Sequence, residues 1–237
     1  MSEVRDVSAR RKGRRSPPDF DADPAQRAEG ERSLGQGRAV RAFFAWELPE
    51  GAKAALGALA TELRARPDGD AVRWVKSENY HVTLRFLGNV ETAVLPALVA
   101  AVRAELDAAK PCEVVLGAPH AFPSARQPRV IVVALEPEAP LAALAERIEA
   151  GVVAAGLPAE KRGFRAHLTL GRVRSRRLPS LDAPALALGP GALAVAEVVL
   201  LQSDLGRDGS RYTPLARLPL APAAAAADPL PLPTSIQ

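Results

Sequence analysis

Two short stretches of this chain carry the residues best suited to chemistry, and they are near copies of each other. His81-Val82-Thr83-Leu84 returns as His167-Leu168-Thr169-Leu170, in a chain with only three histidines. Polar and apolar residues alternate in each copy, which is the pattern of a strand with two different faces. Each strand therefore presents an imidazole and a hydroxyl on one face. The alternation continues after the first copy, so we expect Arg85 on the polar face and Phe86 on the apolar one.

Paired acid-base chemistry on a tetrahedral anion is what these side chains could perform together. An imidazole has an unperturbed pKa of about 6.5, so one histidine can donate a proton near neutral pH while the other accepts one. Threonine hydroxyls can donate hydrogen bonds to anionic oxygens. Residues i and i+2 of a strand lie roughly 6.6 Å apart, which lets both tips reach oxygens of one group. This prediction requires the two strands to lie near each other.

Other uses of the histidines are less well supported by the sequence. A single copy would be read as a structural histidine, and the duplication of both His and Thr is what favours a site. A zinc site would need further ligands, but no suitably spaced carboxylate or third histidine accompanies the pair, so we expect no metal and no cofactor. His120 has no Thr two residues later, and we interpret it as a loop residue.

The surroundings of the second copy are basic. No acidic residue interrupts the series Lys161, Arg162, Arg165, Arg172, Arg174, Arg176 and Arg177. Such a local charge attracts polyanions, although a solvated basic loop would look the same. The whole chain has a formal net charge of only +4, so global charge adds little.

The periodicity of the apolar residues and the positions of Gly and Pro predict a mixed α+β fold with helices on the outer faces. The expected strands span 41–46, 72–75, 81–87, 112–116, 130–135, 167–170, 195–202 and 212–218, and the expected helices span 49–65, 91–109 and 140–155. A loop containing His120 and Phe122 is expected between the fourth and fifth strands. Because the motif copies are 86 residues apart, we predict two similar lobes related by a pseudo-twofold axis.

The two ends of the chain lack a core-forming pattern. Residues 1–38 are charged and poor in large apolar side chains, and residues 221–237 are rich in Ala and Pro, so we expect flexible tails around one domain at 39–220. No apolar run is long enough to cross a bilayer, and no secretory signal is evident. The single cysteine, Cys112, excludes an internal disulfide. We expect a cytoplasmic monomer with no membrane contact.

The motif pair and its flanking blocks resemble a known family. The two His-x-Thr-Leu tetrapeptides are the hallmark of the 2H phosphoesterases, and the chain is most similar to the RNA 2′,3′-cyclic phosphodiesterases, long called 2′-5′ RNA ligases. The resemblance covers about residues 40–220. Besides the motifs, it rests on Arg41 to Ala45, Leu48-Pro49, Trp74-Val75, Arg85 to Gly88, Phe122 to Ser124, Pro128 to Val130, Arg165-Ala166, Ser203 to Leu205 and Tyr212 to Leu215.

The resemblance implies a bilobal fold with one motif on a central strand of each lobe, in which two antiparallel-rich sheets line a central cleft and the helices lie outside. It also implies metal-independent hydrolysis of RNA 2′,3′-cyclic phosphate ends to 2′-phosphates, with His81 as proton donor and His167 as proton acceptor. Thr83 and Thr169 would hold the phosphate. The residues by themselves leave the donor and acceptor roles open, and they do not separate hydrolysis from 2′-5′ ligation or 2′-5′ cleavage, or from a nucleotide- or RNA-binding module without turnover.

The expected partners are RNA ends or nucleotide 2′,3′-cyclic phosphates. Around the central four residues, we expect Arg165, Arg172 and Phe44 to contact the RNA.

Overall fold

A computed structural model of the protein describes residues 38–175, 177–182, 191–206 and 209–220. The two predicted tails lie outside the described residues, apart from Arg38. No described helix is both long and apolar enough to cross a membrane. The helices are α2 (Glu50–Ala65), α3 (Leu95–Leu106) and α4 (Glu138–Ala154). The strands are β1 (Ala39–Glu47), β2 (Val72–Trp74), β3 (His81–Glu91), β4 (Cys112–Phe122), β5 (Val130–Glu136), β6 (His167–Val173), β7 (Leu193–Val195), β8 (Glu197–Gly206) and β9 (Gly209–Pro219).

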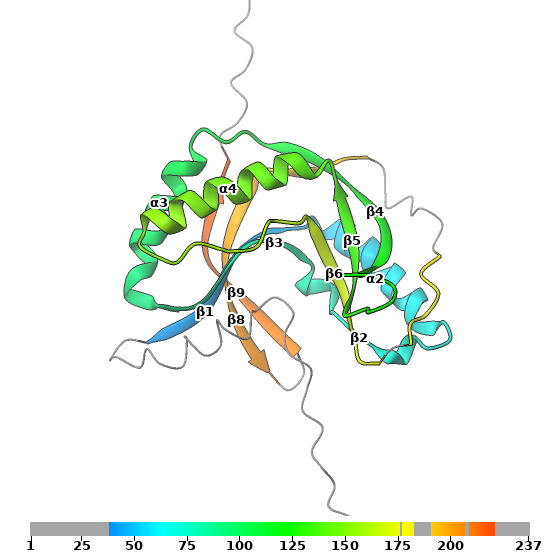
Figure 1. The fold of residues 1–237 in the computed structure, drawn as a ribbon. Helices are drawn as coiled ribbons and strands as arrows, with labels where there is room; N and C mark the ends of the chain where they lie inside the picture. The colour runs from blue at the N-terminus through cyan, green and yellow to red at the C-terminus, as the bar shows by residue number, and fades with distance from the viewer. Residues whose placement is uncertain (1–37, 176, 183–190, 207–208, 221–237) are drawn as a thin grey trace, which may run out of the picture.

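The described strands form one strongly curved antiparallel sheet rather than two (Figure 1). The strand order is β7-β4-β5-β6-β3-β1-β8-β9, and β2 also pairs with β6. The prediction of two separate sheets is therefore wrong. The physical reason is that the two motif strands pair with each other, through the register partners Val82 and Leu168. That contact joins a first half (β3, β1, β8 and β9) to a second half (β6, β5, β4, β7 and β2).

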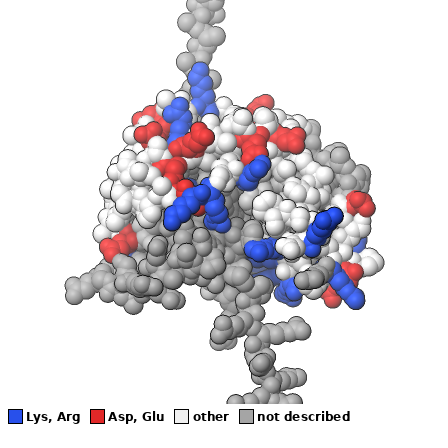
Figure 2. Space-filling view, viewed as in Figure 1, with Lys and Arg blue, Asp and Glu red and all other residues white. Residues whose placement is uncertain are grey.

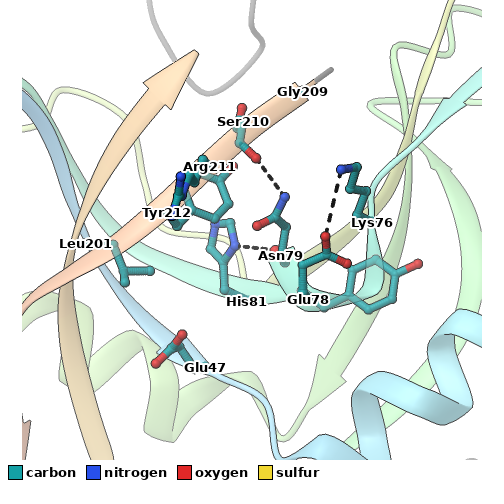
Figure 3. Close-up of a pocket in the computed structure, with 11 residues that line it drawn as sticks. Glu47, Lys76, Glu78, Asn79, His81, Leu201, Gly209, Ser210, Arg211 and Tyr212 are labelled. Carbon is teal, nitrogen blue, oxygen red and sulfur yellow. Dashed lines mark hydrogen bonds and ion pairs between the residues drawn. The ribbon is translucent and has the colours of Figure 1, made fainter. Parts of the chain in front are cut away.

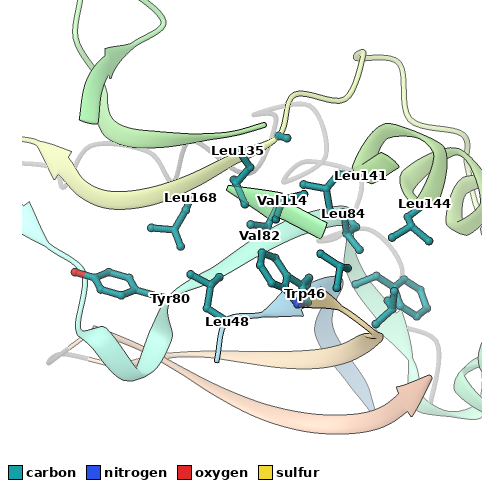
Figure 4. Close-up of a cluster of buried hydrophobic side chains, with 14 of the residues drawn as sticks. Trp46, Leu48, Tyr80, Val82, Leu84, Val114, Leu135, Leu141, Leu144 and Leu168 are labelled. Atoms are coloured by element: carbon teal, nitrogen blue, oxygen red, sulfur yellow. The ribbon is translucent and has the colours of Figure 1, made fainter. Parts of the chain in front are cut away.

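All three described helices cover one face of the sheet. Helix α2 lies beside β2 in the second half, while α3 and α4 pack on each other and cross the first half above β3 (Figure 1). Apolar side chains recur at helical spacing toward the sheet, as Leu56, Leu59 and Leu63 do in α2. The larger hydrophobic core fills this space and includes residues from both halves (Figure 4).

Each motif strand carries a bulge directly after its Thr. On β3 the register passes from Ala45 opposite Thr83 to Phe44 opposite Arg85, so Leu84 is an extra residue. On β6 the same happens at Leu170. An extra residue reverses the side-chain alternation that follows it, because two neighbours then face the same way.

The first bulge corrects the prediction for Arg85 and Phe86. Arg85 is 7% exposed and turns to the helical side, where it pairs with Glu149 of α4. Phe86 turns to the opposite side and joins a smaller apolar cluster with Phe43 and Tyr212. In the second copy Gly171 takes the position of Arg85, and Arg172 takes that of Phe86.

Two predicted boundaries also differ from the structure. Strand β4 continues through Phe122, so His120 lies on a strand and not in a loop; a register shift between Leu116 and Pro119 absorbs the Gly117-Ala118-Pro119 segment that looks like a strand end. Helix α3 begins at Leu95 rather than near Glu91, because β3 extends past Gly88. Gly88 has φ +74°, a conformation that glycine adopts without strain.

Candidate active site

The two motif copies meet where the halves of the sheet join. Val82 and Leu168 are direct partners, and both are completely buried. Continuing this antiparallel register places His81 level with Thr169, and Thr83 level with His167. Residues directly opposite each other have Cβ atoms about 5 Å apart, so this register brings the backbone positions of the His of each copy and the Thr of the other together where the strands join. The four side chains share the face that the helices leave uncovered, and all four are half-buried.

Both imidazoles are oriented by the same backbone device. His81 Nδ1 lies 2.8 Å from the carbonyl oxygen of Asn79, and His167 Nδ1 lies 2.8 Å from that of Arg165. A carbonyl only accepts hydrogen bonds, so Nδ1 carries the proton in each ring. Nε2 is then the nitrogen that gains or loses a proton. On His81 it lies 3.2 Å from the hydroxyl oxygen of Thr83, within the first motif copy.

Aromatic rings flank both histidines. Phe43 and Tyr212 each lie 5.0 Å from the His81 ring between centroids, with Tyr212 edge-on. Phe122 stacks on His167 at 5.8 Å with an interplanar angle of 9°. The sequence reasoning gave these three residues no role in the site. All three belong to blocks that carried the family resemblance, which was the available signal for them.

The structure does not support Phe44 as an RNA contact. Its side chain is completely buried in the larger core, on the helical side of β1. The neighbouring Phe43 points to the opposite face and contacts His81. The sequence selected the wrong member of this Phe-Phe pair because both faces of β1 are apolar, and alternation alone does not tell which face adjoins the site.

The two predicted arginines have different positions. Arg172 lines a small cavity of about 20 Å³ together with His81 and Thr83, so it reaches from the second half of the sheet to the first motif. The Arg165 side chain is exposed, and the residue's carbonyl is the one that contacts His167.

The rest of the predicted basic series is partly balanced by acids. Arg162 pairs with Glu160, and Arg177 lies 3.9 Å from Asp68. Arg176 lies outside the described residues. On the face shown in Figure 2, most acidic side chains gather over the helical side at the top, interspersed with basic ones.

A larger cavity of about 490 Å³ opens beside His81 (Figure 3). Strand β9 and the 3₁₀ turn Ser77–Asn79 form its two sides, and the Asn79 side-chain amide donates a hydrogen bond to the Ser210 carbonyl across them. Tyr80 also lines it, and burial raises the pKa of this phenol to about 12, with a smaller opposite effect from Arg64. Tyr80 therefore stays protonated at neutral pH.

The segment that leads into His167 is held by two carboxylates of α4. Glu149 accepts the Glu160 N–H at 2.7 Å and binds Arg85, which also donates to the Pro158 carbonyl at 2.6 Å. Glu138 accepts the Ala166 N–H at 3.3 Å. Arg85 thus links the strand of the first histidine to the segment before the second. In the described part of the chain, no three His, Cys, Asp or Glu side chains gather as a metal site would require.

Known proteins are similar to this chain in sequence and in fold. Residues 49–207 match the model of the 2′-5′ RNA ligase superfamily. The chain belongs to this superfamily. An RNA 2′,3′-cyclic phosphodiesterase of Methanothermobacter thermautotrophicus is 32% identical over 73% of this chain and 95% of its own length. One from Aeropyrum pernix is 32% identical over 62% of this chain and 85% of its own length. The resemblance drawn from the motifs is confirmed.

Two solved structures of similar fold each cover about three quarters of this superfamily member. TT0787 of Thermus thermophilus is 30% identical with a TM-score of 0.64, covering 76% of this chain and 97% of its own. E. coli LigT, crystallised with 3′-AMP, is 27% identical with a TM-score of 0.63, covering 77% of this chain and 99% of its own.

Proposed function

We propose that this protein hydrolyses RNA 2′,3′-cyclic phosphate ends to 2′-phosphates, with His81 and His167 as an acid-base pair. The observation that carries the proposal is the matched orientation of the two imidazoles. Each Nδ1 donates a hydrogen bond to the carbonyl oxygen two residues earlier. The two motif strands pair with each other between the two histidines. Both Nε2 atoms are thereby kept for proton transfer. The names of the archaeal relatives support the choice of substrate.

The reaction needs one proton acceptor and one proton donor. Nε2 of neutral His167 takes a proton from water while the water oxygen forms a bond to phosphorus. The bond from phosphorus to O3′ breaks, and Nε2–H of protonated His81 gives its proton to O3′. The products are a 2′-phosphate and a free 3′-hydroxyl, and exchange with solvent restores both rings. Thr83, Thr169 and Arg172 hold the phosphate oxygens, and donors aimed at developing charge stabilise the transition state.

The test is cleavage of a short RNA that ends in a 2′,3′-cyclic phosphate, in the presence of EDTA. We expect a 2′-phosphate product and a bell-shaped pH profile of kcat/KM, since one histidine must be protonated and the other neutral. His81→Ala and His167→Ala should each lower kcat by roughly 10²- to 10⁴-fold, the usual contribution of a proton-transfer group. Full activity in both variants would rule out the mechanism, and stoichiometric nucleotide binding without turnover would indicate a binding module.

A second activity of the same site is favoured by the superfamily to which the chain belongs. If the 5′-hydroxyl of another RNA replaces water, attack on the cyclic phosphate with loss of O3′ joins the ends through a 2′-5′ linkage. The same two histidines would transfer the protons, and the reverse reaction would cleave that linkage. Incubation of 5′-hydroxyl RNA with cyclic-phosphate RNA, followed by separation on a denaturing gel, distinguishes joining from hydrolysis.

A further inference from the structure

The cavity beside His81 has no role in the proton transfers described above. Its volume of about 490 Å³ lies within the range of small-molecule sites. It is lined by Glu47, Lys76, Glu78, Asn79, Tyr80, His81, Leu201, Gly209, Ser210, Arg211 and Tyr212. The lining includes His81 but not His167, so the cavity belongs to one side of the candidate active site.

The cavity is adjacent to the place where the phosphate would bind. His81, Ser210 and Tyr212 line it and also line the small cavity that contains Thr83 and Arg172. A phosphate held by Thr83 and Arg172 would therefore lie next to the opening. The remainder of the same ligand could extend past the His81 and Tyr212 rings into the larger space.

The positions of the bond that forms and the bond that breaks at phosphorus indicate which part of the ligand would enter this cavity. In an in-line displacement the attacking oxygen and the leaving oxygen lie on opposite sides of phosphorus. The leaving O3′ belongs to the ribose, so the nucleoside lies on the side of the proton donor, and water enters on the side of the proton acceptor. With His81 as donor, the nucleoside lies on the side where this cavity opens.

The lining suits a flat base with hydrogen-bond donors on its edge. Leu201 is buried and apolar, and the Tyr212 ring stands beside it, on the same side of the sheet. Two carboxylates provide acceptors. Glu47 already binds Arg217 at 3.0 Å, whereas Glu78 lies 3.9 Å from Lys76 and its side chain is 67% exposed. Glu78 is therefore the carboxylate more available to a ligand, and ionised carboxylates only accept hydrogen bonds.

We propose that this cavity binds the base of the nucleotide that carries the cyclic phosphate, and that Glu78 makes it prefer bases with an exocyclic amino group. Adenine, cytosine and guanine have such a group, while uracil presents a carbonyl oxygen there and would face the carboxylate with an acceptor. The inference rests on the proposed function, because it uses the position of the phosphate and the identity of the leaving oxygen.

The test compares the 2′,3′-cyclic phosphates of adenosine, cytidine, guanosine and uridine with the base-free methyl riboside 2′,3′-cyclic phosphate. We expect kcat/KM for the base-free compound to be about tenfold lower than for the amino-bearing nucleosides. The loss should come mainly from a higher KM, because the missing base removes binding contacts and not a group that takes part in the reaction. Uridine should also be about tenfold poorer than cytidine. In Glu78→Gln the cytidine-to-uridine ratio should fall towards one, because an amide offers both a donor and an acceptor.

Glu146→Gln is the matched control, since Glu146 is an exposed glutamate on α4 and should leave the ratio unchanged. The inference is overturned if the base-free compound is hydrolysed as well as the nucleotides, or if Glu78→Gln keeps the wild-type ratio. It is also overturned if only a base further along an RNA chain affects the rate. If neither these compounds nor the cyclic-phosphate RNA is hydrolysed, the proposed function fails, and calorimetry with cytidine and uridine 2′-phosphates then tests the cavity by itself through the ratio of their affinities.

Discussion

At the scale of single residues, the candidate site depends on backbone carbonyls as much as on side chains. Asn79 and Arg165 orient His81 and His167 through their carbonyl oxygens, so their own side chains are not needed for this purpose. Fixing the ring removes its rotational freedom before a substrate arrives, and it selects the nitrogen that transfers the proton. The hydroxyl of Thr83 lies beside that nitrogen and provides the next contact.

The threonines should act through their hydroxyls and not through their shape. Thr83→Val and Thr169→Val keep the branched side chain but remove a donor to the anionic phosphate. A hydrogen bond to a charged group contributes about 1.5–3 kcal/mol, so kcat/KM should fall roughly 10- to 100-fold in each variant. Steady-state kinetics on a nucleoside 2′,3′-cyclic phosphate measures the loss. Thr83→Ser and Thr169→Ser should retain most activity, and equal losses in the Val and Ser variants would contradict a hydroxyl role.

At the scale of elements, the two bulges decide which residues reach the site. Without them, Arg85 would share a face with His81, and Gly171 with His167. The bulges instead direct Arg85 to α4 and bring Phe86 and Arg172 to the open face. The two motif strands thus have equivalent backbones but different side chains, which gives the two halves of the site different walls.

Glu149 should act as a positioning residue for His167. Glu149→Ala removes the partner of Arg85 and the acceptor of the Glu160 N–H, so the segment before His167 loses its anchor. Small displacements of reacting groups can cost up to about 10²-fold in rate, and we expect kcat to fall roughly 10- to 100-fold with little change in KM. Glu149→Asp should recover part of this loss. Glu146→Ala on the same helix is the control, and a normal kcat in Glu149→Ala would contradict the role.

Gly171 should be required for the fit of β2 against β6. A Cβ atom at this position would lie 2.5 Å from Val72 Cγ1 and 3.3 Å from the Arg73 carbonyl oxygen. Gly171→Ala should therefore lower the free energy of unfolding by about 1–3 kcal/mol, the usual cost of overpacking. Gly163→Ala is the matched control, because nothing lies within 4 Å of its added Cβ. Urea denaturation of both variants measures the difference, and equal stabilities would show that β2 shifts without cost.

At the scale of the whole molecule, few backbone pairings join the two halves of the sheet, but the two halves share one hydrophobic core. Their strands are joined through the pairing of Val82 with Leu168, yet the larger apolar cluster includes Trp46 and Leu200 from one half and Val114 and Leu170 from the other. When the protein unfolds, side chains from both halves lose their contacts in this shared core at the same time. The lobes predicted from the sequence are therefore parts of one packed unit.

The described fold should unfold in a single cooperative transition. The chain has two tryptophans, and they report on different halves: Trp46 lies on β1, and Trp74 lies on β2 beside β6. Trp46→Phe leaves only Trp74 as a probe, and Trp74→Phe leaves only Trp46. In each variant, the fluorescence midpoint in urea should coincide with the midpoint from far-UV circular dichroism. Separate midpoints for fluorescence and circular dichroism within one variant would show that the halves unfold independently.

Much of this molecule could be predicted from the sequence by itself. The alternation in the two His-x-Thr-Leu copies gave their strands and the shared face of each His and Thr. Helical spacing gave α2 and α4 closely, because an amphipathic helix repeats its apolar residues over several turns. The family resemblance followed from the same motifs and their flanking blocks.

Only the tertiary structure decided how the copies meet and what surrounds them. A bulge is one extra residue in a pairing, and it has no signature in a single strand, so the positions of Arg85 and Arg172 could not be derived from alternation. Phe43 and Phe44 are equally apolar, and which of them contacts His81 depends on the face that the helices cover. The joining of two expected sheets into one depends on the pairing of residues 86 positions apart, which local propensity does not encode. The sequence therefore determined the reactive residues, and long-range pairing determined how they are arranged.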